Sequence, residues 1–304
     1  MSTLDLHVEV GHPLVRGGLA LYPLFGDGPV APEYLPGPLA ASAGSLRVAE
    51  REDGPSVPEL GVTNAGLLPL LLVEGENLLG GWQNRTLNVS VLIAAGRSAA
   101  VPVSCVERGR WGGSREGARP APAMSPSALR ARKQRAVAHG VFAGAPERRS
   151  DQGEVWEAVS GYATRFEAAA PTEALADVQQ ARHGDVMAMV AGTRPLEGQR
   201  GVAVAIAGRV RSVDLFDRAA TLAAYWDALV QGYALDAVGV EADSPPPGRR
   251  GVVQAFDDLR TARTRSVPGV DLGLEVHATA ADLTAGALVW DDICVHLGLH
   301  RVPA

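Results

Sequence analysis

Runs of residues that alternate between apolar and polar, or that are apolar throughout, gather in two separate parts of this chain, and a block with helical spacing lies between them. Period-two alternation is typical of β-strands, whereas apolar residues three and four positions apart are typical of helices. Clusters of strands separated by a run of helices predict an α+β fold with antiparallel or mixed sheets, rather than a strict alternation of strands and helices. This grouping restricts the fold more than any single motif does.

The first cluster of predicted strands occupies the first third of the chain. Pro23 cannot donate a backbone hydrogen bond, so its strand is expected at a sheet edge or at a bulge. A turn at Gly96 separates the last two strands, which we expect to be adjacent. The predicted strands are residues 4–10, 19–25, 67–73, 85–96 and 99–107.

The middle and the end of the chain combine helices with a second cluster of strands. Pro and Ser residues begin the central helices, and Gly208 marks the turn of a predicted hairpin. The Pro-rich residues 244–250 are the clearest linker. We therefore divide the chain into a main domain, residues 1–245, and a C-terminal segment, residues 246–304, that packs on it. The predicted helices are residues 127–140, 150–166, 172–182, 217–238 and 254–265, and the predicted strands are 201–216 as a hairpin, 270–280 and 287–299.

Composition and charge restrict the class of protein. Hydrophobic residues make up 46% of the chain and charged residues 20%, which is the balance of a folded protein and not of a disordered one. The formal net charge of −6 gives no overall attraction to a polyanion, so nucleic acid is an unsupported partner. No apolar run approaches the roughly 18 residues of a membrane span, and residues 1–10 lack the pattern of a secretion signal. We expect a cytoplasmic protein with no membrane partner.

Cysteine and histidine spacing indicates no metal and no cofactor. Cys105 and Cys294 lie far apart without a CxxC pair, so neither a disulfide framework nor a zinc knuckle is predicted. The 7 histidines show no HExxH or similar spacing. Almost every basic residue is arginine, and Lys133 is the only lysine.

The densest group of polar residues follows the predicted strand at residues 67–73. Two adjacent glycines there allow a tight turn or a close approach of the backbone to a ligand. Loops at the ends of buried strands commonly display binding groups, although amides in a turn also satisfy backbone groups, so a structural role stays open for each residue. The candidate ligand-binding residues are Glu76, Trp82, Gln83, Asn84, Arg85 and Asn88.

A second polar group begins at Cys105, near the end of the neighbouring strand. Glu107 is expected on the same face of that strand as Cys105. Both are candidate catalytic residues, because a thiolate is a nucleophile and a carboxylate can act as a general acid or base. The structural alternatives are a core cysteine and an ion pair between Glu107 and Arg85. Arg110 and Trp111 complete the ligand-binding set, since an indole ring stacks on a base or sugar, or closes a core.

The segments VEGENLLGGWQNRTLNVSVLIAAG and VPVSCVERGRW, supported by SDQGEVW, AGRVRSVDLFD and AYWDALVQGYALDA, resemble a family of mostly bacterial proteins. This family is named for its association with ADP-ribosylglycohydrolase and rhodanese-phosphatase proteins. The family pattern often has a lysine before Gln-Asn-Arg, where this chain has Trp82, so a role that depends on that lysine is in doubt. The resemblance implies a link to ADP-ribose or NAD-derived nucleotides rather than a particular reaction.

Three functions remain open. The first is binding or sensing of an ADP-ribose-like nucleotide, in which Arg85 would contact a phosphate and Trp82 or Trp111 would stack on the ligand. The second is a hydrolase or transferase at an N-glycosidic or phosphoester bond, with Glu107 as general acid or base. The third is a structural or regulatory partner protein without a ligand. We place Arg85 and Glu107 on adjacent strand ends at the rim of one pocket.

The final strands also predict a homodimer. Residues 287–295 carry large apolar side chains near a terminus, where an uncovered edge would allow pairing between two copies of the chain.

Overall fold

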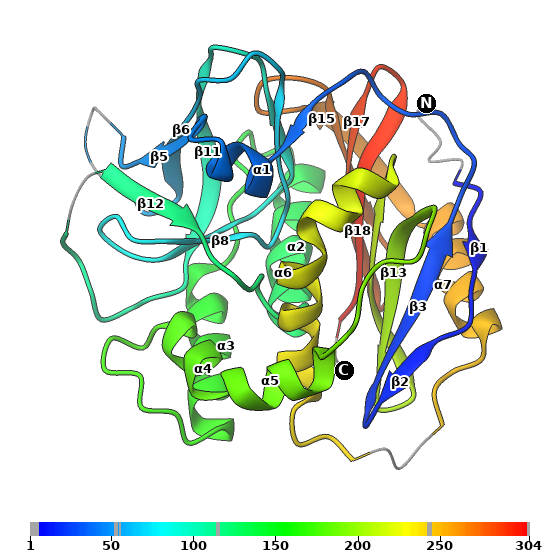
Figure 1. Cartoon of the computed structure of the whole chain (residues 1–304). Coiled ribbons are helices and arrows are strands. Elements are labelled where there is room, and N and C mark those ends of the chain that lie inside the picture. Colours follow the sequence, from blue (N-terminus) through cyan, green and yellow to red (C-terminus); the bar gives the residue numbers. More distant parts are fainter. Residues whose placement is uncertain (1–5, 52–53, 55, 114–115, 242–244, 303–304) are drawn as a thin grey trace.

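The alternating segments form strands of a closed barrel, a small mixed sheet and a nine-stranded antiparallel sheet (Figure 1). The computed structural model describes residues 6–51, 54, 56–113, 116–241 and 245–302. It confirms the predicted α+β fold with antiparallel and mixed sheets. Part of the strand predicted at residues 4–10 and the first residue of the predicted linker at 244–250 lie outside the described residues.

The large sheet joins strands from both ends of the chain. Its order is β1-β3-β13-β14-β18-β17-β16-β15, with β2 paired to β3. The C-terminal β18 hydrogen-bonds to β14, so the end of the chain continues the sheet that the hairpin β13–β14 begins. The bounds are β1 (Glu9–Val10), β2 (Leu14–Arg16), β3 (Leu19–Phe25), β13 (Gln199–Ile206), β14 (Arg209–Phe216), β15 (Arg263–Pro268), β16 (Leu274–Thr279), β17 (Leu283–Trp290) and β18 (Ile293–Arg301).

Helices cover both faces of this sheet, which explains why its central strands are apolar on both sides. Val202 and Val204 of β13 pack in one core with α6, whereas Ala203 and Ala205 of the same strand pack in a second core with α7. Strands buried on two faces lack the simple alternation of a half-exposed strand. The helices are α1 (Gly37–Ser42), α2 (Ser127–Ala143), α3 (Gln152–Arg165), α4 (Leu175–Ala181), α5 (His183–Val190), α6 (Ala219–Ala237) and α7 (Arg249–Thr261).

The barrel closes in the order β11-β6-β5-β12-β8-β9, and a separate three-stranded sheet, β10-β7-β4, contains one parallel pair. β9 pairs with β11, as predicted for these two segments. Helix α2 lies between barrel and large sheet: Val137 and Val141 pack in the barrel's core, while other residues of α2 contact β17 and β18. The bounds are β4 (Leu35–Pro36), β5 (Leu46–Ala49), β6 (Glu59–Asn64), β7 (Leu70–Leu72), β8 (Asn77–Leu79), β9 (Arg85–Leu87), β10 (Val91–Ile93), β11 (Ser98–Cys105) and β12 (Glu116–Pro120).

The prediction of one last strand over residues 287–299 is wrong. The chain turns at Asp291 and Asp292, which have φ angles of 54° and 60°, and β17 pairs with β18 as a hairpin. Aspartate tolerates the left-handed region better than most residues, and a two-residue turn with both φ positive suits the twist of a hairpin. Both strands are flanked by other strands, so residues 287–295 present no uncovered edge. Self-association of the chain stays a prediction without that support.

Two other boundaries also differ from the prediction. The helix expected over residues 254–265 ends at Thr261, because Ala262 is extended and β15 begins at Arg263. The helix expected over residues 172–182 begins only at Leu175, and α5 follows it, so four helices and not three separate the strand clusters.

Pro23 is not at a sheet edge, the first of the two predicted places, but lies next to an irregularity of the β3–β13 ladder, between Gln199 and Gly201. β3 has β13 on one side and both β1 and β2 on the other. The carbonyl oxygen of Pro23 accepts from the backbone N–H of Gly11, at the gap between β1 and β2. The missing N–H of proline therefore falls where the ladder is already interrupted.

Candidate functional site

Arg85 is a fully buried guanidinium at one end of the barrel. It lies on β9 opposite Cys105 of β11, and it shares its strand face with Leu87, which packs in the apolar core of the barrel. Its side chain is 0% exposed, and none of its three guanidinium nitrogens has a hydrogen-bond partner among the described residues. Burial lowers its pKa from the ordinary value. Because buried polar groups in folded proteins are almost always paired, this side chain is the strongest anomaly at the predicted site.

Two tryptophans lie next to this guanidinium. The Trp82 and Trp111 rings meet edge to face, with centroids 5.4 Å apart and planes at 88°. The guanidinium carbon of Arg85 is 5.9 Å from the centroid of the Trp111 ring. Trp111 is 51% exposed, so one surface of this aromatic pair is open to solvent. The rings therefore separate a buried cation from the exterior.

Three further polar atoms, on residues that neighbour Arg85 in the chain or act on its charge, are buried without a partner among the described residues. They are Glu50 Oε2, Trp82 Nε1 and Gln83 Oε1. Glu50 uses its other oxygen to accept from the backbone N–H of Trp82 at 3.0 Å, and the charge of Glu50 acts on Arg85. Donors and acceptors thus occur together, as a ligand with both kinds of group would require. We call Glu50, Trp82, Gln83, Arg85 and Trp111 the barrel-end cluster.

Glu107 does not pair with Arg85, so the structural ion pair considered from the sequence is absent from the described residues. Glu107 instead accepts from Arg110 Nε at 2.8 Å and Nη2 at 2.6 Å, from the backbone N–H of Asn84 at 2.9 Å and from Thr172 Oγ1 at 2.9 Å. Burial raises its pKa, but these hydrogen bonds outweigh burial and hold the pKa below the ordinary value. Glu107 is therefore a carboxylate whose bonds join the two loops beside the cluster.

Cys105 is buried on the strand that pairs with β9. Its thiol donates to the carbonyl oxygen of Glu107 at 2.8 Å, and the side-chain amide of Gln152 bonds both its backbone N–H and its carbonyl. Burial raises the pKa of the thiol. A thiol that stays protonated is a weak nucleophile, so the catalytic roles of Cys105 and Glu107 stay predictions.

The remaining predicted residues divide between the cluster and other places. Asn84 and Arg110 border it, because Asn84 Oδ1 accepts from the backbone N–H of Gly80 at 3.0 Å and from Arg110 at 3.3 Å. Asn88 instead donates to the carbonyl oxygen of Arg148 at 3.0 Å. Glu76 accepts from the backbone N–H of Val73 at 3.2 Å, and burial raises its pKa to about 7.

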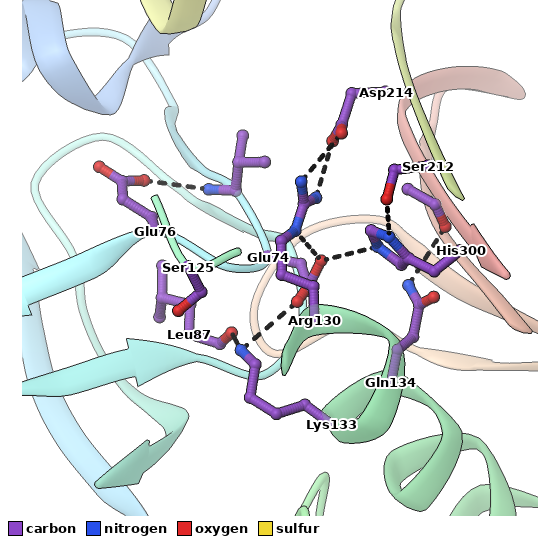
Figure 2. Close-up of polar contacts among 12 residues, drawn as sticks. Glu74, Glu76, Leu87, Ser125, Arg130, Lys133, Gln134, Ser212, Asp214 and His300 are labelled. Carbon is purple, nitrogen blue, oxygen red and sulfur yellow. Dashed lines mark hydrogen bonds and ion pairs between the residues drawn. The ribbon is translucent and has the colours of Figure 1, made fainter. Parts of the chain in front are cut away.

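A second set of polar residues, which the sequence did not predict, forms a buried network between the barrel and the large sheet (Figure 2). Arg130 of α2 donates two bonds to Asp214 of β14, at 2.9 and 2.7 Å, and one to Glu74 at 2.9 Å. Lys133, one turn further on, donates to the carbonyl oxygen of Leu87 and lies 3.4 Å from Glu74. The network therefore connects α2 to the barrel and to the large sheet.

Mutual pairing decides the charge states in this network. Burial alone would raise the pKa of Glu74, but the positive charges of Arg130 and Lys133 outweigh burial and lower the pKa to about 2. Burial lowers the pKa of Lys133 to about 8 even though Glu74 opposes this shift. The sequence carried no clear signal for this network, because the burial of Lys133 is visible only in the structure. Once buried, a lysine requires a partner.

Two histidines of β18 extend the network in the order serine, histidine, carboxylate. Ser90 Oγ lies 2.8 Å from His296 Nδ1, and His296 Nε2 lies 3.0 Å from Asp214. Ser212 Oγ lies 2.8 Å from His300 Nδ1. This order resembles a catalytic triad, but the cavity beside Ser90 has a volume of about 10 Å³, which accommodates about one water and no larger substrate. The network is therefore structural in this conformation.

Neither a metal centre nor a membrane span is visible in the part of the chain that the structure describes. Among those residues no group of three or more His, Cys, Asp or Glu side chains is arranged to hold a metal ion. No helix among them is both long and apolar enough to cross a bilayer.

The fold and the barrel-end cluster define an α+β protein that combines a small closed barrel with a large antiparallel sheet. Its barrel holds a cation that has no partner in the described part of the chain. Residues 7–300 match the model of ARPP-1, described as the ARG and Rhodanese-Phosphatase-superfamily-associated Protein domain. The chain belongs to this family, as the resemblance indicated. No match was found among curated proteins or among solved structures.

Proposed function

We propose that this chain binds an ADP-ribose-like or NAD-derived nucleotide at the barrel-end cluster. The observation that carries the proposal is the fully buried guanidinium of Arg85, whose nitrogens have no partner among the described residues. An isolated buried charge is strongly unfavourable, and a guanidinium is the side chain best suited to bind a phosphate through two parallel hydrogen bonds. A phosphate at this position would supply the missing acceptors.

The neighbours of Arg85 fit the other parts of such a ligand. The aromatic pair Trp82 and Trp111 offers a surface on which a base can stack. Glu50 Oε2 and Gln83 Oε1 are free acceptors among the described residues, and ribose hydroxyls are donors that could satisfy them. The family name records an association with ARG, the ADP-ribosylglycohydrolase, which favours this nucleotide class over other anions.

Catalysis by Glu107 is less favoured by this geometry. Its carboxylate already accepts four hydrogen bonds, so work as a general acid or base would require its release from Arg110, Asn84 and Thr172. Hydrolysis or transfer at an N-glycosidic or phosphoester bond therefore stays the alternative, and a partner protein without a ligand is the third possibility.

Calorimetric titration of the whole chain with ADP-ribose, NAD and AMP tests the proposal. We expect binding of at least one of them, and Arg85→Ala should weaken it by about 1.5 to 3 kcal/mol through loss of charge-assisted bonds. Arg97→Ala is the matched control, because Arg97 precedes the opposite end of β11 and its side chain is 66% exposed. Absence of heat with all three ligands at millimolar concentration, or equal affinity of both variants, would overturn the proposal.

A further inference from the structure

The outermost strand of the large sheet, β15, has a free edge. It pairs with β16 on one side and with no other strand among the described residues. Figure 1 shows β15 at the side of the sheet that is turned toward the barrel. All of its residues are exposed except the half-buried Val267. An unpaired strand edge offers a row of backbone donors and acceptors to another extended chain.

This edge borders a large groove. Arg265, Val267 and Pro268 of β15 line it, together with Glu59 and Pro102 of the barrel. Residues 144–149, which follow α2, complete the lining, and the volume is about 680 Å³. Ligand sites in proteins are typically about 300 to 1,000 Å³, so the groove has room for several residues of an extended segment.

Arginines outnumber glutamates at this groove, although the whole chain is negative. The lining holds Arg148, Arg149 and Arg265 against Glu147 and Glu59, and Glu59 is paired with Arg51. Arg263 lies beside the lining on the same strand as Arg265.

Arg265 donates to the carbonyl oxygen of Phe142 at 3.1 Å, and Arg263 lies over the ring of Phe142, 4.5 Å from its centroid. Both side chains are thereby held at the exposed edge. Arg149 is a further exposed arginine in the lining. Arg148 is neutralised, because it donates to Glu275 at 2.9 Å.

We propose that the edge of β15 and this groove bind an extended acidic segment of a partner protein, which adds a strand to the large sheet. Backbone bonds to β15 would provide affinity, and carboxylates on alternate residues would pair with the arginines. The same arginines oppose pairing of β15 with a second copy of this chain, because like charges on neighbouring strands destabilise the pair. This surface is distinct from the barrel-end cluster and does not depend on nucleotide binding.

Fluorescence anisotropy with labelled peptides tests the proposal. The probe is a heptapeptide in which glutamate alternates with valine, and one control peptide has lysine in place of glutamate. Two further controls carry N-methyl groups on alternate backbone nitrogens, one peptide for each register, because alternate N–H groups of a strand point to opposite edges. We expect the whole chain to bind the unmodified acidic peptide and the acidic peptide methylated on the edge away from β15, but neither the lysine peptide nor the other methylated register. Equal binding of the lysine peptide or of both N-methylated registers would overturn the proposal.

Charge reversal at the edge locates the binding surface. Arg263→Glu together with Arg265→Glu should raise the Kd for the acidic peptide about tenfold or more. Arg209→Glu is the matched control, because Arg209 is an exposed arginine of β14, outside the groove lining, and should leave the Kd unchanged. Circular dichroism verifies that each variant is folded. Unchanged affinity after the double reversal would refute an acidic partner at this edge. The same holds if the native chain forms a dimer in sedimentation without peptide and the double reversal strengthens that dimer.

Discussion

Arg85 is buried in the barrel with no partner among the described residues, and this has a consequence for stability. Arg85→Met keeps a long side chain but removes the charge, so it should raise the free energy of unfolding by about 1 to 4 kcal/mol, as replacement of unfavourable buried charges does. Urea denaturation of both proteins measures the change. A loss of about 3 to 5 kcal/mol would instead show that the guanidinium is paired.

The buried carboxyl group of Glu76 makes the stability of the protein depend on pH. Burial raises its pKa from 4.5 to about 7, so the folded state holds a proton more tightly than the unfolded state. The corresponding stabilisation is complete below pH 4.5 and is lost as the pH rises through about 7. Glu76→Gln should therefore make the protein more stable than the native chain at pH 8, by about 1 to 3 kcal/mol, and no different near pH 4.

Thermal unfolding at these two pH values separates the outcomes. A variant that is destabilised at pH 8 but not near pH 4 would mean that the ionised carboxylate is the form that the fold prefers. The hydrogen bond from the backbone N–H of Val73 can still reach the amide oxygen of the variant, so the acceptor is conserved.

Helix α2 is held by ion pairs from Arg130 to two buried carboxylates. Arg130→Met leaves Glu74 and Asp214 buried without their main cation, so it should cost about 3 to 5 kcal/mol in denaturation. Arg132→Met is the matched control, because Arg132 is exposed on the same helix and should change stability by less than about 0.5 kcal/mol. Similar effects of both substitutions would contradict the role assigned to the network.

The hairpin of β17 and β18 is a second test at the scale of elements. Asp291 and Asp292 occupy the two positions with positive φ. Asp292→Gly should stabilise the protein by about 1 kcal/mol, because glycine adopts that region without the clash of a side chain. Asp292→Val should destabilise it, and the opposite order of the two melting temperatures would show that the turn has a different geometry.

The buried network predicts how the whole molecule responds to acid. The pKa of Glu74 is lowered to about 2, so its stabilisation is present above pH 4.5 and is lost as the pH falls through about 2. Because Glu74 and Asp214 join α2 to both the barrel and the large sheet, acid should unfold the two parts together. Near-ultraviolet and far-ultraviolet circular dichroism should give coincident transitions in this range, and Glu74→Gln should be less stable at pH 7 and less sensitive to acid. Two separate transitions would contradict this coupling.

The sequence alone determined the class of fold and the main helices of this protein. Alternation and helical spacing depend on which side of an element faces the core, so they are visible in the sequence. This local signal identified the hairpin at residues 201–216 and the helix at 217–238. It also identified the adjacency of the strands at 85–96 and 99–107. It failed at residues 287–299, because a run buried on both faces hides a two-residue turn. The family resemblance extended over nearly the whole chain, as residues 7–300 confirm.

Only the tertiary structure decided which polar residues are partners. The sequence left open whether Glu107 pairs with Arg85 or serves a ligand, whereas the fold pairs Glu107 with Arg110 and leaves Arg85 unpaired among the described residues. Glu74, Arg130 and Asp214 are far apart in the chain and meet because α2 lies between the barrel and the large sheet. Pairing of buried charges depends on distances of a few ångströms between elements, and sequence periodicity contains no information about those distances.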